Sequence, residues 1–192
     1  MTTQSVGRMP PIPRNRMSDA QRAAADDLAA GPRKGVKGPF IALLRSPELM
    51  SRLQRVGEFL RFQSSLPARV SEFGSLVLSR QWTQQFEWFT HVPLALKAGT
   101  VRETIDALRE GRRPATMSAD EALVYDFVTE LTLNKGVCDS SYQECINCLG
   151  EQGVVDLVGL VGYFTLISMV LNVANTPADA VEDVAPLPAL PR

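Results

Sequence analysis

The most constraining feature of the sequence is a long apolar run, VVDLVGLVGYFTLISMVLNVA, from Val154 to Ala174. Its length is close to the roughly 20 apolar residues that can span a bilayer. The run nevertheless contains Asp156, Thr165, Ser168 and Asn172, and no basic residues flank it to set a membrane topology. We therefore interpret it as a buried helix that is apolar on all sides and is covered by other helices or by a second subunit. We expect no membrane association.

Start and stop signals for helices punctuate most of the remaining chain. The first four predicted helices run from a Ser18–Gln21 capping box to Gly31-Pro32, from Ser46-Pro47 onward, from Pro67 to about Arg80, and from about Gln84 to Lys97 with Gly99 as a left-handed cap. Later signals are the Thr100–Glu103 and Ser118–Glu121 capping boxes, before helices near 101–110 and 119–134, and a start at Ser140 with Gln143. Period-2 alternation bounded by hairpin turns does not occur, so we predict an all-α bundle without strands.

The helix that follows Ser46 carries a recognisable apolar stripe. Leu49, Leu53, Val56 and Leu60 recur at intervals of three or four residues. Such spacing puts the four side chains on one face of a helix, and we expect that face to pack inward.

Length and composition indicate a single domain. With 192 residues, 45% of them hydrophobic, the chain is large enough and apolar enough to bury a core. The two ends are rich in proline and small residues. We therefore expect an extended N-terminal arm at 1–17, a helical domain at 18–175 and a Pro/Ala-rich C-terminal tail at 176–192.

Charge and cysteine content limit the partners and the compartment. Lys and Arg number 20 against 21 Asp and Glu, so no basic field attracts phosphate backbones and we expect no nucleic-acid partner. The three cysteines, Cys138, Cys145 and Cys148, are odd in number and clustered, unlike the disulfide framework of a secreted protein. The N-terminal segment is interrupted by arginines and prolines and lacks an export signal. We expect a cytoplasmic protein.

The only histidine of the chain belongs to a polar group at helical spacing. Gln84, Glu87 and His91 stand at i, i+3 and i+7, along one face of the predicted helix. A helical hairpin with its turn near 81–83 would bring Glu72 back toward the same region. A carboxylate that orients an imidazole is what general acid–base chemistry requires. The alternative is an ordinary surface pair of Glu87 with His91, with Glu72 as a solvated carboxylate.

Several segments resemble a known family. They are GPF from Gly38, RSPEL from Arg45, the L-x-x-R-x-x-E segment at Leu66, Arg69 and Glu72, and EWFTHVPLALKAG up to Gly99. With the later apolar run as a closing helix, residues 38–174 resemble the carboxymuconolactone decarboxylase family of the AhpD-like superfamily. The resemblance implies an AhpD-like helical bundle that assembles as a homo-oligomer, a trimer or a hexamer, with sites near the subunit contacts.

The resemblance also implies a chemistry for the His91 group. In the peroxidase branch of that superfamily, a C-x-x-C-x-x-x-H motif supplies a redox thiol pair, but its two cysteine positions match Gln84 and Glu87 here. The chain is therefore similar to the branch without this motif. That branch implies a lyase that decarboxylates 4-carboxymuconolactone or a similar small lactone, in aromatic-compound catabolism, with no metal and no organic cofactor. His91 would donate a proton to the dienolate, Glu72 would orient it, and Glu87 would complete the relay.

Four further residues are candidates for substrate binding: Gln84, Trp88, Arg69 and Arg45. Trp88 is adjacent to Glu87, and an aromatic wall would exclude water. An anionic substrate calls for a cation, which Arg69 or Arg45 could supply. Against this, aromatic residues at helical spacing usually fill a core, and arginines on helix faces are usually solvated.

Two other functions stay open at this point. Cys145 and Cys148 form a C-x-x-C pair, which an alkylhydroperoxidase-like thiol enzyme would use, although thiols on a predicted helix are more often buried apolar groups. Alternatively, an oligomer of this fold binds a small molecule without catalysis. Convergence of Glu72, Glu87 and His91 in a cavity, rather than dispersal on the surface, would favour the enzyme.

Overall fold

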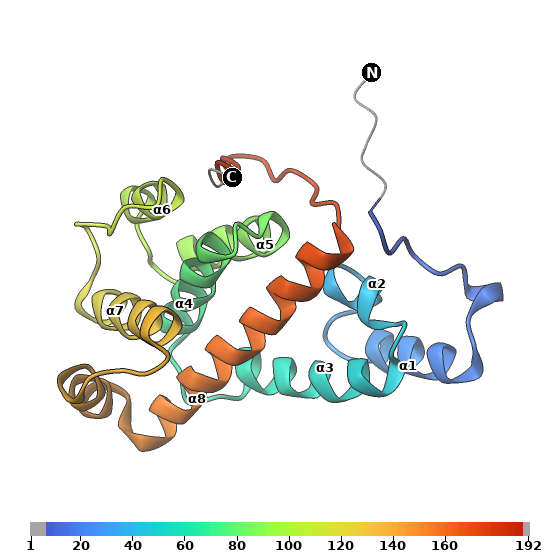
Figure 1. Ribbon diagram of the computed structural model, residues 1–192, viewed down its shortest axis with the longest axis horizontal. Coiled ribbons are helices and arrows are strands. Elements are labelled where there is room, and N and C mark those ends of the chain that lie inside the picture. The colour runs from blue at the N-terminus through green and yellow to red at the C-terminus, as the bar shows by residue number, and fades with distance from the viewer. Residues whose placement is uncertain (1–6, 190–192) are drawn as a thin grey trace.

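The computed structural model of the protein describes residues 7–189, and within them every regular element is a helix. A short 3₁₀ helix, η1 (Arg14–Arg16), precedes eight α-helices (Figure 1): α1 (Asp19–Ala30), α2 (Pro39–Leu43), α3 (Pro47–Phe62), α4 (Ala68–Gln81), α5 (Gln85–Lys97), α6 (Arg102–Arg109), α7 (Ala119–Asn134) and α8 (Asp139–Ala174). The all-α prediction is therefore confirmed for the described part of the chain.

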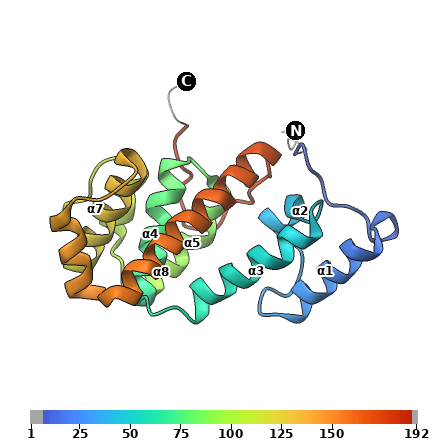
Figure 2. The ribbon, with the colours of Figure 1, turned by 60° about the horizontal axis from the view of Figure 1, so that its bottom comes forward.

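The long helix α8 organises the packing. It contacts α4 and α7 on one side and α2 and α3 on the other, while α1 packs on α3 and α5 packs on α4. Figure 2 shows α1 to α3 and α4 to α7 as two groups that α8 joins. The backbone leaves helical geometry at Gly150, with φ 71° and ψ 174°, so α8 is two helical segments joined at a kink. The predicted helix from Val154 to Ala174 is the second segment.

The burial of α8 agrees in part with the sequence. By length and composition it is the helix among the described residues that could cross a membrane, yet 56% of its most apolar window is buried inside the protein. The buried side includes Leu157, Leu160 and Leu171. The other side leaves Val155, Val158, Met169 and Val173 exposed to solvent. Among the described residues, other helices therefore cover only one side of α8, and coverage of the exposed side by a second subunit stays a prediction.

The predicted inward stripe of α3 is wrong in two of its four residues. Leu49 and Val56 are 45% and 47% exposed, whereas Leu60 is buried and Leu53 is half-buried. The helix instead buries the face that contains Gly57, because a Cβ at that position would overlap the Tyr163 hydroxyl group of α8. Close approach of the two helices thus decides which face of α3 turns inward.

The helix starts follow the predicted signals in most places. The predicted capping boxes are present at Ser18, with Gln21, and at Ser118, with Glu121. The predicted box at Thr100 is wrong, because its hydroxyl group donates to Glu121 over 2.6 Å and α6 has Val101 as its N-cap. The predicted start at Ser140 is also displaced, since Cys138 is the N-cap of α8. At Thr100, a carboxylate on another helix therefore competes for the hydroxyl group that was expected to form the cap.

The described parts of the predicted arm and tail pack on the helical domain. The Trp88 indole donates to the Ala185 carbonyl oxygen over 3.0 Å, and the Leu187 amide donates to Gln85 over 3.1 Å. Leu187 is buried, so the tail covers one end of α5. The remainder of the predicted arm and tail, 1–6 and 190–192, lies outside the described residues.

Candidate functional site

The hairpin of α4 and α5 brings the predicted polar residues together. Helix α4 ends at Gln81, Thr83 takes a left-handed conformation with φ 48°, and α5 begins at Gln85. Gln84 is the N-cap, and its side-chain oxygen accepts from the Phe86 amide over 2.7 Å. The turn therefore lies where the sequence predicts it.

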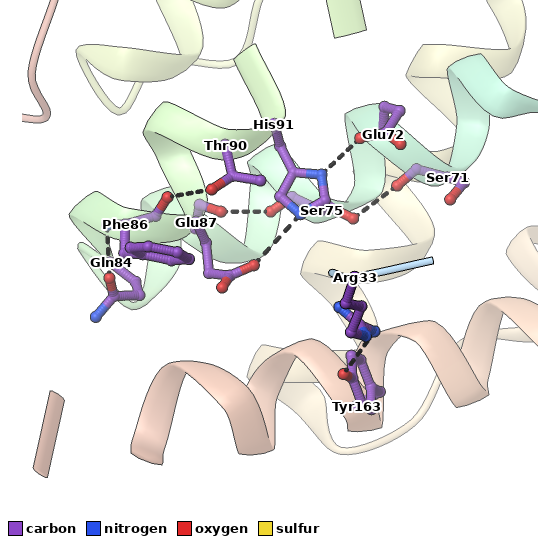
Figure 3. Close-up of polar contacts among 11 residues, drawn as sticks. Arg33, Ser71, Glu72, Ser75, Gln84, Phe86, Glu87, Thr90, His91 and Tyr163 are labelled. Carbon is purple, nitrogen blue, oxygen red and sulfur yellow. Dashed lines mark hydrogen bonds and ion pairs between the residues drawn. The ribbon is translucent and has the colours of Figure 1, made fainter. Parts of the chain in front are cut away.

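His91 stands between two carboxylates (Figure 3). Its Nδ1 lies 2.5 Å from Oε2 of Glu72 on α4, and its Nε2 lies 3.3 Å from Oε2 of Glu87 on the preceding turn of α5. The imidazole is 2% exposed and forms a T-shaped pair with the Phe164 ring of α8 at a centroid distance of 5.0 Å. The three residues therefore converge as predicted, and the alternative of a solvated surface pair is wrong.

The two carboxylates set the charge of this histidine. Burial is the largest single influence on the pKa of His91 and lowers it. The hydrogen bonds and negative charges of Glu72 and Glu87 together outweigh burial, so the pKa is raised above 6.5. The upward shift favours the imidazolium, which has a proton on each ring nitrogen, over the neutral ring. The contact with Glu72 is short and the contact with Glu87 is long, so the Nε2 proton is the less tightly held of the two.

A cavity of about 360 Å³ opens beside Glu87 and His91. Its walls come from the loop after α1, the start of α2, the end of α3, and from α5 and α8. The described lining residues are Pro32, Arg33, Gly35, Lys37, Pro39, Phe40, Arg61, Phe62, Phe86, Glu87, Thr90, His91, Tyr163, Phe164 and Ile167. The cavity thus combines a proton-transfer group, aromatic walls and basic side chains, and its size suits a small molecule.

Gln84 and Trp88 do not line this cavity. The Gln84 amide donates to the Asn172 side chain over 2.8 Å and so links α5 to the end of α8. Trp88 is fully buried and its indole is held by the C-terminal tail. Both residues fix the position of α5, and Trp88 fills the core as aromatic residues at helical spacing usually do.

The two arginines named from the sequence also lie elsewhere. Arg69 forms an ion pair with Asp120 over 2.9 Å, and Arg45 donates to the carbonyl oxygens of Ile41 and Pro10. Neither belongs to the cavity lining. Each guanidinium is held by partners that lie outside the cavity lining.

The basic side chains that do reach the cavity are Arg33, Lys37 and Arg61. Sequence reasoning missed all three. Arg33 and Lys37 lie in the glycine-containing loop between α1 and α2, and Arg61 lies in the last turn of α3. No local motif marks them, because only the packing of these segments against α8 turns them toward His91.

The cysteine pair, Cys145 and Cys148, does not line this cavity. Cys145 is buried while Cys148 is exposed, and all three cysteines have free thiols. Burial raises the pKa of Cys145 to about 11, which keeps that thiol protonated at neutral pH, whereas a nucleophilic thiol must ionise. The expectation that both thiols are buried is wrong for Cys148.

Within residues 7–189, no group of three or more His, Cys, Asp or Glu side chains could hold a metal ion. No protein-family model matches the chain, and no curated protein matches it as a relative. The site is therefore defined by its own geometry: in an all-helical protein, buried His91 lies between Glu72 and Glu87, beside a small cavity.

Proposed function

We propose that this protein is an acid–base lyase that decarboxylates a small carboxylated compound of the lactone type, as carboxymuconolactone decarboxylases do. The observation that carries the proposal is that His91 lies between the carboxylates of Glu72 and Glu87, and that His91 and Glu87 line a cavity with basic side chains. A second feature in its favour is the raised pKa of His91, because the shift favours the protonated ring that the reaction needs as a donor.

The proposed reaction needs one proton for each molecule of carbon dioxide released. The bond between the carboxylate carbon and the ring breaks, and its electron pair delocalises into the conjugated lactone carbonyl to give a dienolate. His91 transfers its Nε2 proton to a carbon of this dienolate. Glu72 keeps its bond to Nδ1 and so holds the ring in place, and water returns a proton to Nε2 beside Glu87.

The test compares carbon dioxide release from 4-carboxymuconolactone by the wild type and by His91→Asn. Asparagine keeps a hydrogen-bonding side chain but cannot donate a proton with a pKa near neutrality, so we expect a loss of about 10²-fold or more in turnover. Glu103→Gln, an exposed carboxylate on α6, is the matched control and should leave turnover unchanged. Undiminished turnover in His91→Asn, or none in the wild type, would reject the proposal.

The AhpD-like fold and a homo-oligomeric state, a trimer or a hexamer, belong to the same proposal. The exposed apolar face of α8 supports an oligomer, because contiguous apolar surface on a protein is commonly an interface. We also propose a cytoplasmic protein with no membrane or nucleic-acid partner. The partial burial of α8 within the protein and the balanced charge of the chain support that proposal.

A further inference from the structure

The cavity contains two guanidinium groups that have no anionic partner. Arg33 and Arg61 both line it, and neither forms an ion pair with any residue in 7–189. The Nε atoms of both side chains are buried and have no hydrogen-bond partner among the described residues. Buried nitrogen atoms usually have a hydrogen-bond partner. The Nε atoms of Arg80 and Arg109 also have none, but of these four half-buried arginines only Arg33 and Arg61 line the cavity, where a ligand would supply one.

The surroundings hold the two arginines in place. The Arg33 guanidinium stacks over Phe40 with its Cζ 4.7 Å from the ring centroid, and Arg61 stacks over Phe62 at 5.3 Å. Arg33 also donates a long hydrogen bond, 3.5 Å, to the Tyr163 hydroxyl group. Stacking on an aromatic ring fixes the plane of a guanidinium and leaves its edge free to bind a carboxylate.

The charges at this end of the cavity repel one another. Burial lowers the pKa of Arg33, and the positive charge of Arg61 lowers it further, while Tyr163, Glu87 and Glu58 act in the opposite direction. Among residues 7–189, Glu87 and Glu58 act only from a distance, since no carboxylate forms an ion pair with Arg33 or Arg61. An anion placed between the two arginines would satisfy both groups.

We propose that Arg33 and Arg61, with the Tyr163 hydroxyl group as a third donor, form a clamp for one carboxylate of the ligand. This inference rests on the proposed function and deepens it, because it assigns the residues that hold the substrate. Phe40, Phe62, Phe86 and Phe164 line the same cavity and favour a flat, unsaturated or aromatic body on that carboxylate.

The clamp also indicates which carboxylate is retained. A carboxylate that loses carbon dioxide must give up its negative charge, and two guanidinium groups stabilise that charge and so oppose the loss. The clamped carboxylate therefore stays on the product. The leaving carboxylate lies nearer the Glu87 and His91 side, where Figure 3 shows these side chains on α5 and the Arg33–Tyr163 pair next to α8. The substrate class is thus a small dicarboxylate.

The test measures the binding of benzoate and of its neutral counterpart benzamide by calorimetry. The wild type should bind benzoate at least about tenfold more tightly than benzamide, since a charge-assisted hydrogen bond is lost with the amide. Arg33→Gln and Arg61→Gln should each lose this preference. Arg55→Gln, an exposed arginine on the same helix as Arg61, is the matched control and should keep it.

The melting temperature of the free protein gives a second readout. Removing one of two mutually repelling cations should leave it unchanged or raise it, and benzoate should raise it in the wild type but not in the clamp variants. Equal binding of benzoate and benzamide, or a full benzoate preference in Arg61→Gln, would overturn the clamp.

The two proposals fail separately in this design. His91→Asn should keep the benzoate preference although it loses turnover. A wild type that prefers benzoate but never releases carbon dioxide would keep the clamp and reject the lyase. A wild type that releases carbon dioxide but binds benzoate and benzamide equally would keep the lyase and reject the clamp.

Discussion

Replacing Glu72 with glutamine is the sharpest test of the charge state of His91. The change keeps a side-chain oxygen within reach of Nδ1 but removes the negative charge 2.5 Å from the ring. Burial is the largest influence on His91 and lowers its pKa, and only Glu87 would then oppose it. We therefore expect the pKa of His91 to be above 6.5 in the wild type and to fall in Glu72→Gln.

The size of the effect follows from the kind of bond that is lost. A hydrogen bond to a charged group contributes about 1.5–3 kcal/mol, and this one lies in a nearly buried environment. Because the folded state raises the pKa of His91, its stabilising contribution is complete below the unfolded value of 6.5 and is lost as pH rises through the folded value. The deficit of Glu72→Gln should therefore be largest at low pH, while the carboxylates are ionised, and smaller above the titration of His91.

Proton NMR can follow this titration directly, because His91 is the only histidine of the chain. The midpoint of its Cε1 proton shift gives the pKa, and urea unfolding on either side of that midpoint gives the stability. Glu103→Gln serves as the control for loss of an exposed carboxylate. A wild-type midpoint below 6.5, or equal midpoints in wild type and Glu72→Gln, would refute the reasoning.

Three further predictions concern other parts of the molecule. The Asp156 carboxylate accepts hydrogen bonds from the amide and from the hydroxyl group of Ser65, each over 2.8 Å. Asp156→Ala should therefore lower the free energy of unfolding by about 1.5–3 kcal/mol. A negligible change in urea unfolding would contradict this. Cys148 is exposed and should react quickly with a thiol reagent in the native protein. Cys145 is buried and has a pKa of about 11, so it should react only when the protein unfolds. Equal reaction rates for Cys145→Ser and Cys148→Ser would contradict this. If the proposed homo-oligomer forms through the exposed face of α8, light scattering should show an oligomer for the wild type and a smaller species for Val158→Lys, whereas a monomeric wild type would show that this face is no homo-oligomer interface.

Local sequence was sufficient for the features that depend on near neighbours. The capping boxes at Ser18 and Ser118 are closed within three residues, and the pairing of Glu87 with His91 follows from one turn of helix. Glu72 is farther along the chain, but a short turn between two helices leaves few ways to place it. These parts of the fold and of the candidate site were predictable because the groups involved are joined by one turn of helix or by one short hairpin.

The tertiary structure decided which side chains complete the site. In the sequence, Arg45 and Arg69 are as suitable for binding an anionic ligand as Arg33 and Arg61. In the structure, Asp120 binds Arg69 and backbone carbonyl oxygens bind Arg45. Arg33 and Arg61 instead line the cavity beside α8. Close approach at a glycine likewise turned α3 away from the predicted stripe. A helix pattern fixes which residues share a face, but the direction of that face depends on contacts between segments far apart in the chain.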